Sequence, residues 1–158
     1  MTELPVRSRV VAAALADAGV EGLVRELPDS ARTAAEAAAA LGVEVGAIAN
    51  SLIFWADDAP LLVLTSGRHR VDTAALAVVL GKERIERATP DQVRAATGQA
   101  IGGVAPVGHS APVETIVDVA LEDYPEVWAA GGTPHTVFPT TFAELVRITG
   151  GRALVVGA

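Results

Sequence analysis

Residues 97–109 have the sequence TGQAIGGVAPVGH, which is the most informative stretch of the chain. Four glycines and Pro106 lie in it, between a predicted helix and a predicted strand. Glycine permits close approaches that a side chain would block, and proline restricts the direction in which the chain leaves the loop. Such a loop can direct backbone N–H groups toward a ligand carbonyl or oxyanion. The alternative is an ordinary glycine-rich connection, which the loop taken alone favours.

The glycine spacing excludes two common phosphate-binding loops. It does not match Gly-x-Gly-x-x-Gly, and it lacks the Lys-Ser or Lys-Thr pair of a P-loop. We therefore predict no nucleoside triphosphate site here.

Helix signals lie on both sides of the loop. Thr89-Pro90-Asp91-Gln92 combines an N-cap, a proline at the first helical position and a capping glutamine. Similar signals predict helices that begin at Thr33, Asp72 and Thr141 and end before Gly42, Gly81 and Gly150. A further helix is expected over residues 5–18, with one apolar stripe composed of Val6, Val10, Ala14 and Ala18 together with Val11 and Leu15.

Short apolar runs between these helices predict strands. Residues 51–56 and 61–65 form a predicted hairpin across Asp57-Asp58-Ala59-Pro60. Other strands are expected at residues 23–27, 84–87, 115–118, 126–129, 136–138 and 153–156. Because a hairpin and several short connections make a purely parallel sheet improbable, we expect a mixed α+β fold with a curved central sheet.

The composition indicates one globular domain over residues 1–158, in which residues 1–29 contribute an N-terminal helix and strand. The chain has 158 residues, of which 51% are hydrophobic and 20% charged. It has no cysteine, so disulfides, thiolate metal sites and cysteine nucleophiles are excluded. Without a signal peptide or an apolar run of roughly 18 residues, the protein is expected to be cytoplasmic and not to bind membranes.

The charge of the chain restricts how it could bind nucleic acid. The formal net charge is −7, whereas a protein that grips a long nucleic acid usually has a basic face. We therefore expect no DNA binding, and contact with RNA only over a small area such as a tRNA acceptor end.

Two other segments place polar residues beside predicted strands. Asn50 and Ser51 stand at the start of an apolar strand, where they could be local caps or hydrogen-bonding groups of a pocket. Gly131 and His135 lie before another strand, and His135 is either a ligand contact or a surface histidine. The three histidines lack metal-ligand spacing, so no metal site is predicted.

The ordered combination of these motifs resembles the YbaK/ProX family of aminoacyl-tRNA editing domains. The resemblance covers roughly residues 30–150 and rests on Thr33-Ala34-Ala35-Glu36, Ile48-Ala49-Asn50-Ser51-Leu52-Ile53-Phe54, Val71-Asp72, Leu80-Gly81 and Ile101 to His109. It implies a barrel-like central sheet surrounded by helices. It also implies hydrolysis of a mischarged aminoacyl-tRNA of the prolyl-tRNA editing type, without a cofactor.

The resemblance also implies which residues form the site. The implied partner is the aminoacyl-tRNA acceptor end, and an aminoacyl-tRNA synthetase is a further candidate. Many family members have a lysine where this chain has Asn50, and asparagine offers no positive charge. The alternative is therefore a non-catalytic module that binds an amino acid or aminoacyl group. The implied catalytic residues are Gly102, Gly103, Pro106 and Asn50, and the implied substrate-binding residues are Ser51, Ile101, Val104, Ala105, Gly108, His109, Gly131 and His135.

Overall fold

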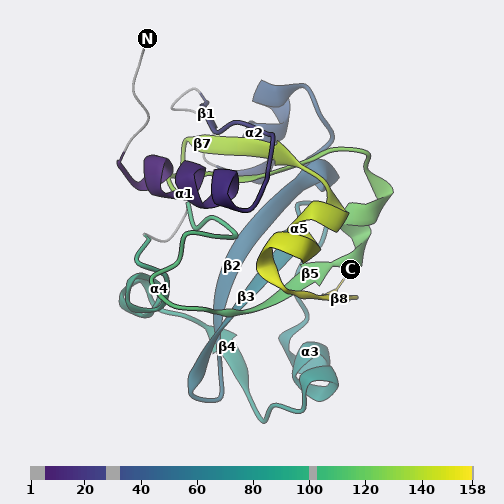
Figure 1. The fold of residues 1–158 in the computed structure, drawn as a ribbon. Helices are drawn as coiled ribbons and strands as arrows, with labels where there is room; N and C mark the ends of the chain where they lie inside the picture. The colour runs from purple at the N-terminus through teal and green to yellow at the C-terminus, as the bar shows by residue number, and fades with distance from the viewer. Residues whose placement is uncertain (1–5, 28–32, 100–102, 158) are drawn as a thin grey trace.

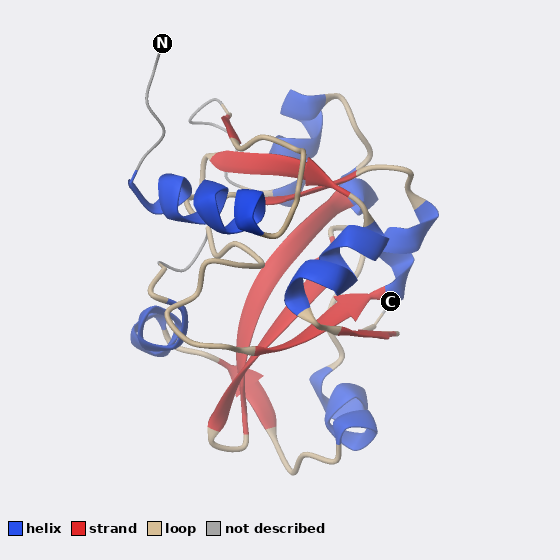
Figure 2. Cartoon of the chain, in the orientation of Figure 1, coloured by secondary structure: helices blue, strands red, loops and turns tan. Residues whose placement is uncertain are grey.

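A mixed eight-stranded sheet forms the centre of the protein, and helices surround it (Figures 1 and 2). The computed structural model describes residues 6–27, 33–99 and 103–157. The order in the sheet is β1-β7-β6-β2-β3-β5-β8, with β4 paired to β2. The strands are β1 (Arg25–Glu26), β2 (Ile48–Ala56), β3 (Ala59–Ser66), β4 (Ile85–Arg87), β5 (Glu114–Asp118), β6 (Val127–Ala130), β7 (Thr136–Thr140) and β8 (Arg152–Leu154).

The sheet is built around the long antiparallel hairpin of β2 and β3, which curves through the middle of the molecule (Figure 1). Asp57 adopts the left-handed conformation at its turn (φ 55°), and its Oδ1 accepts hydrogen bonds from the N–H groups of Glu83 and Arg84, each at 3.1 Å. Strand β5 pairs in parallel with β3, and β6 pairs in parallel with β2. The predicted mixed α+β fold is confirmed.

Local capping explains where most helices begin and end. The helices are α1 (Val6–Asp17), α2 (Ala34–Leu41), α3 (Thr73–Leu80), α4 (Pro90–Thr97) and α5 (Phe142–Thr149), with 3₁₀ turns η1 (Val45–Ala47) and η2 (Val119–Asp123). The side chains of Thr33, Asp72, Thr89 and Thr141 each accept a hydrogen bond from the first turn of the following helix, and Thr89 forms a complete capping box with Gln92. These predicted helix starts are confirmed.

The predicted apolar stripe of the N-terminal helix is confirmed at Val11 and Leu15 and wrong at Val6 and Val10. Val6 and Val10 are 66% and 54% exposed, whereas α1 buries Ser8, Val11 and Leu15. Val11 and Leu15 are turned by about 100–180° around the helix axis from Val6 and Val10, because each residue turns the helix by about 100°. Only the inner side contacts the core, where the Ser8 hydroxyl is 2.9 Å from Thr136 Oγ1.

The predicted strands all occur, with bounds that differ by at most three residues. Strand β2 begins earlier than expected because Ile48 and Ala49 pair with β6. The first and last predicted strands are shorter than expected, and Val155 lies beyond β8 with 73% of its surface exposed.

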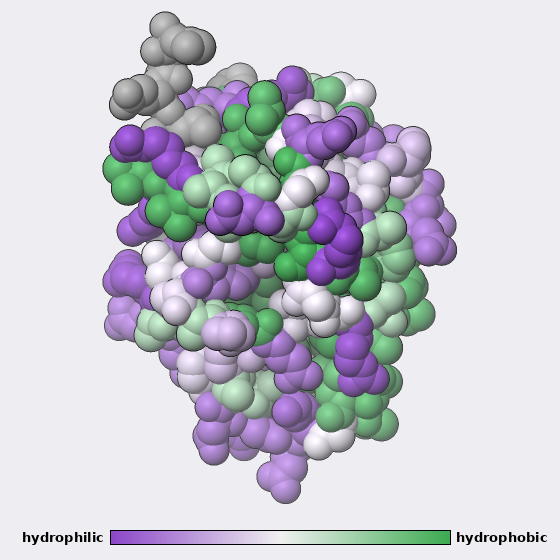
Figure 3. Space-filling view, in the orientation of Figure 1, coloured by the Kyte–Doolittle hydropathy of each residue, from purple (hydrophilic) through white to green (hydrophobic). Residues whose placement is uncertain are grey.

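The sheet is buried on both faces. Leu61 to Leu64 of β3 are all 0% exposed. Alternation along the strand places Leu62 and Leu64 in the core with α1, α4 and α5, and Leu61 and Val63 in a second core beneath α3. Within the described residues, no helix combines the length and apolar content needed to cross a bilayer. Figure 3 shows a hydrophobic area over α3, where Val78 is 82% exposed.

Candidate functional site

A cavity of about 400 Å³ lies where β2 and β6 separate. The two strands pair only through Ile48 with Trp128 and Ala49 with Ala129. Further along, β2 pairs with β4 from Phe54 to Ala56. Among the described residues, the intervening segment 50–52 therefore pairs with β3 alone. The sheet is open at this point, and segments from both of its faces line the opening.

The cavity wall is mostly apolar and built from small side chains. Arg87 is the only charged residue among the described residues that form it. The wall combines residues of β2, β4, β6 and β7, the start of α2, one residue of α4 and several loop residues: Leu27, Thr33, Ala34, Ala37, Ile48 to Ile53, Arg87, Val93, Gly103, Val104, Trp128 to Ala130, Thr133, Pro134, Thr136 and Val137.

Gly103 brings the glycine-rich loop against the loop that precedes β7. A Cβ atom at Gly103 would lie 2.6 Å from the backbone nitrogen of Pro134 and would also meet the backbone of Thr133. Such contacts essentially do not occur, so a side chain at residue 103 would force the two backbones apart. Two segments that looked like separate candidates in the sequence thus form adjoining parts of one cavity wall.

Gln99 holds the glycine-rich loop in place. Its side chain is 3% exposed, and its Oε1 accepts a hydrogen bond from the N–H of Ala105 at 2.8 Å. Its Nε2 donates to the carbonyl oxygens of Val107 and Gly108 at 3.1 and 3.3 Å. One buried amide thus satisfies three backbone groups of the loop, a role for which the sequence has no local signal.

The structure separates the residues that the sequence had grouped in this loop. Gly103 and Val104 line the cavity together with Asn50 and Ser51. Ala105 is fully buried and bound to Gln99. Ile101 and Gly102 lie outside the described residues. Pro106, Gly108 and His109 line a different hollow beside α5, together with Ile148 and Thr149.

Gly131 and His135 lie next to the cavity but are not part of its wall. The N–H of the buried Gly131 donates to the carbonyl oxygen of Thr136 at 2.7 Å. The N–H of His135 donates to the hydroxyl of Thr133 at 3.3 Å. Both residues therefore shape the loop that carries Thr133, which itself lines the cavity.

His109 is tied to the loop rather than directed into the cavity. Its Nε2 lies 2.7 Å from the carbonyl oxygen of Ala105. Burial lowers the pKa of His109 from its ordinary value of 6.5, and the contact with the Ala105 carbonyl opposes that shift. The neutral ring is therefore favoured in the folded protein.

Asn50 and Ser51 present their side chains to opposite faces of β2, because successive residues of a strand alternate. Ser51 is paired with Leu64, which belongs to the core beneath α1 and α5, whereas Asn50 is paired with Thr65. Among the described residues, three buried side-chain atoms have no hydrogen-bond partner: Ser51 Oγ and Trp128 Nε1, which line the cavity, and His135 Nδ1, which lies beside it. Leaving such groups unpaired is costly, so these two cavity-lining residues retain hydrogen-bonding capacity for a ligand.

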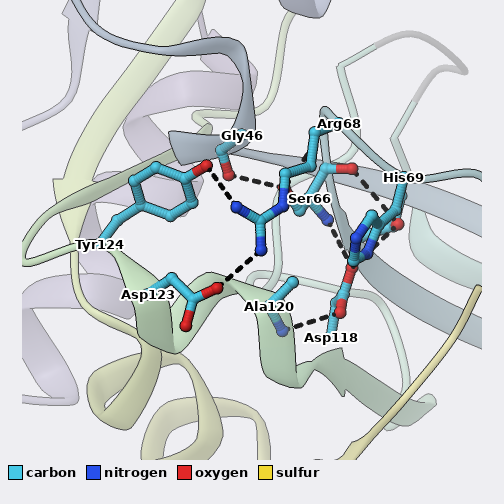
Figure 4. A network of polar contacts seen from close by, with 9 residues as sticks. Gly46, Ser66, Arg68, His69, Asp118, Ala120, Asp123 and Tyr124 are labelled. Carbon is cyan, nitrogen blue, oxygen red and sulfur yellow. Dashed lines mark hydrogen bonds and ion pairs between the residues drawn. The ribbon is translucent and has the colours of Figure 1, made fainter. Parts of the chain in front are cut away.

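A second polar cluster, which the sequence analysis missed, lies at the end of β3 (Figure 4). The buried Asp118 accepts hydrogen bonds from the N–H groups of Ser66 and Ala120 at 3.0 and 2.9 Å, and its Oδ2 lies 3.0 Å from His69 Nδ1. The Ser66 hydroxyl instead donates to the carbonyl oxygen of Gly46 at 2.7 Å. The serine is thus bound to backbone, which does not fit a nucleophile activated by His69.

Arg68 extends this cluster to the surface. It contacts Asp123 Oδ2 at 2.6 Å and donates to the Tyr124 hydroxyl at 2.9 Å. The cluster joins η1, β3 and η2, and none of its members is among the described residues that line the cavity. We interpret it as a structural connection. Within the described residues, no group of three or more His, Asp or Glu side chains is placed to hold a metal ion.

Comparison with known proteins gives consistent matches. The family described as "Aminoacyl-tRNA editing domain" matches residues 28–148. A crystal structure of a candidate trans-editing enzyme for prolyl tRNA synthetase is 44% identical, has a TM-score of 0.92 and is covered over 99% of each chain. The uncharacterized protein YwhH of Bacillus subtilis is 32% identical over 127 residues, which are 79% of this chain and 80% of YwhH.

Longer relatives match over a part of their length. The proline–tRNA ligase of Nitratidesulfovibrio vulgaris (strain DP4) is 35% identical over 115 residues, which are 73% of this chain and 19% of the ligase. The chain thus spans about a fifth of the length of the ligases that it matches.

Proposed function

Because the chain belongs to the aminoacyl-tRNA editing domain family, we propose that it hydrolyses the ester of a mischarged aminoacyl-tRNA of the prolyl-tRNA editing type, acting in trans. The observation that carries this proposal is the cavity between β2 and β6. Its wall combines Asn50 and Ser51 with Gly103 and Val104, the segments on which the family resemblance rests.

In the proposed reaction, a water molecule attacks the ester carbonyl of the aminoacyl group. The resulting tetrahedral oxyanion collapses and breaks the bond to the terminal ribose oxygen, which takes up the proton that the water loses, so that the products are a free amino acid and a free tRNA. The chain contributes by positioning the ester and stabilising the developing negative charge.

The N–H groups of Gly103 and Val104 are the best candidates for that stabilisation. In hydrogen bonds within the described residues, neither group acts as a donor. The N–H of Ala105, in contrast, is engaged by Gln99. Of the described residues in segment 102–106, we therefore propose that Gly103 and Val104 supply the backbone N–H groups that contact the ester carbonyl.

The size and lining of the cavity favour a small amino acid. A volume of about 400 Å³ is near the lower end of the roughly 300–1,000 Å³ typical of ligand pockets. The terminal nucleoside must share this space with the aminoacyl group. Val93, Val104 and Ala129 leave room for a short side chain, and we therefore propose alanine or serine as the residue that is removed.

A second candidate function is that of a non-catalytic module that binds an aminoacyl group. Asn50 favours it, because an asparagine lines the cavity where many family members have a lysine. Asparagine can donate and accept hydrogen bonds but cannot attract a phosphate by charge. Both functions use the same cavity and differ in whether the ester is cleaved.

A panel of mischarged tRNAs distinguishes the two functions. Release of amino acid from alanyl- or seryl-tRNA carrying the proline anticodon, above the uncatalysed rate, is the expected result. Absence of hydrolysis across the panel, together with thermal stabilisation by aminoacyl-sulfamoyl adenosines, would instead support the binding module. Asn50→Lys is an informative companion, because activity present only in this variant would show that the parent lacks a required charge.

A further inference from the structure

Arg87 occupies a distinctive position at the cavity. It is the last residue of β4 and is paired with Phe54 of β2. Its guanidinium carbon lies 5.8 Å from the centroid of the Phe54 ring, within the range of a cation–π contact. The residue is exposed to solvent and also lines the cavity. A positive charge is therefore held over an aromatic ring at the point where solvent meets the site.

Among the described arginines that form no ion pair with a described residue, Arg87 is the one that lines the cavity. Arg84, Arg94 and Arg147 each lie within 4 Å of a carboxylate. For Arg87 no ion pair occurs among the described residues, and no acidic side chain within that part of the chain lines the cavity. In a protein with a net charge of −7, this local cation favours an anionic ligand at the edge of the cavity.

We propose that Arg87 binds the phosphodiester backbone of the tRNA acceptor end, so that a positive charge borders the cavity although residue 50 is an asparagine. The inference rests on the proposed function. Phe54 and Asn50 are four residues apart on one face of β2, which corresponds to about 13 Å at roughly 3.3 Å per residue. A single-stranded RNA end that enters over Leu52 would therefore pass Arg87 before its terminal group reaches Asn50.

The chemistry of arginine suits this role. A planar guanidinium presents several N–H donors in a fork that matches phosphate oxygens, and it keeps its charge at every physiological pH. Stacking on Phe54 restricts its orientation and leaves N–H donors at its edge available for a phosphate. Arg87 would thus position the RNA and take no part in cleaving the ester.

The test uses the full chain and a short RNA hairpin that ends in an unpaired CCA sequence without an amino acid. The dissociation constant is measured over a series of salt concentrations for the parent, Arg87→Gln and Arg84→Gln. Arg84→Gln is the matched control, because it changes the net charge equally but removes an arginine that pairs with Glu86 and does not line the cavity. Thermal melting verifies that all three proteins are folded.

We expect Arg87→Gln to weaken binding about tenfold at low salt, as for the loss of one charge-assisted hydrogen bond. The slope of log K against log salt concentration should decrease by about 0.7, the value for one phosphate contact on a single strand. Arg84→Gln should resemble the parent in both quantities. In hydrolysis, Arg87→Gln should raise KM and leave kcat nearly unchanged.

Two results would overturn the inference. The first leaves the proposed hydrolysis intact, and the second contradicts the proposed function as well. If Arg87→Gln and Arg84→Gln change binding and its salt slope equally while the parent still hydrolyses mischarged tRNA, only the role of Arg87 fails. If the parent neither binds the hairpin nor hydrolyses any substrate, the proposed function fails together with it.

Discussion

Replacing Gln99 by leucine tests how the glycine-rich loop is held. Leucine has a similar size but cannot reproduce the three hydrogen bonds that the Gln99 side chain makes with the backbone of Ala105, Val107 and Gly108. At about 0.5–1.5 kcal/mol per hydrogen bond, these contacts together stabilise the fold by about 3 kcal/mol. Because Ala105 is fully buried, water cannot replace the lost acceptor for its N–H.

Urea denaturation at 25 °C measures this loss directly. We expect the free energy of unfolding to fall by about 3 kcal/mol with an unchanged m-value, and the melting temperature to fall by roughly 6–12 °C. Gln92→Leu is the control, because the Gln92 side chain accepts one exposed hydrogen bond from the N–H of Thr89, at 2.9 Å. Its loss should cost at most about 1 kcal/mol.

The comparison of the two leucine variants decides the outcome. If Gln99→Leu costs no more than Gln92→Leu, the buried amide does not hold the loop and the reasoning is refuted. If the loop also positions the ester, Gln99→Leu should lower kcat for hydrolysis of mischarged tRNA under conditions in which the variant remains folded.

Three further changes probe the site. Gly103→Ala would place a Cβ atom 2.6 Å from the backbone nitrogen of Pro134. We therefore expect the free energy of unfolding to fall by about 1–3 kcal/mol and the rate of hydrolysis to fall more than tenfold. An unchanged rate of hydrolysis would exclude residue 103 from the reacting centre. Burial lowers the pKa of His109. Below about pH 6.5 the unfolded chain therefore binds a proton more readily than the folded chain does. The free energy of unfolding should then fall with decreasing pH, by up to about 1.4 kcal/mol per pH unit. Urea titrations from pH 8 to 5 should therefore show a flatter stability profile for His109→Gln than for the parent, and equal slopes would contradict this assignment. Ser51→Ala removes a buried hydroxyl that has no hydrogen-bond partner among the described residues. The free energy of unfolding should therefore stay within about 1 kcal/mol of that of the parent, while KM for hydrolysis should rise. A large loss of stability would mean that the hydroxyl is hydrogen-bonded in the folded protein.

Helix starts and the central hairpin could be predicted from the sequence because the interactions that specify them are local. Thr89 and Gln92 cap the same helix from positions three residues apart. Gly98 ends that helix in the left-handed conformation, with φ at 73°. The apolar runs of β2 and β3 are joined by a short turn, so their pairing required no knowledge of the rest of the chain.

The exposed face of α1 could not be predicted in the same way. Val6 and Val10 are as apolar as Val11, and only the packing of the helix against the sheet shows which of them are buried. Arg87 stands in a segment without a motif, and the glycine-rich stretch that contains Gln99 gives no local signal for the role of that side chain. Both roles follow from the strand or loop that lies opposite each residue.

By itself, the sequence determined the secondary-structure elements, the mixed α+β fold and the family resemblance, because caps, turns and apolar runs act over a few residues. The tertiary structure decided which of the candidate residues share a cavity. In the folded chain Ser51, Gly103 and Thr133 line one cavity, whereas His109 lines a separate hollow. The physical reason is that β2 and β6 meet through only two residue pairs and then diverge, and the register of strands so far apart in the chain depends on packing of the whole core.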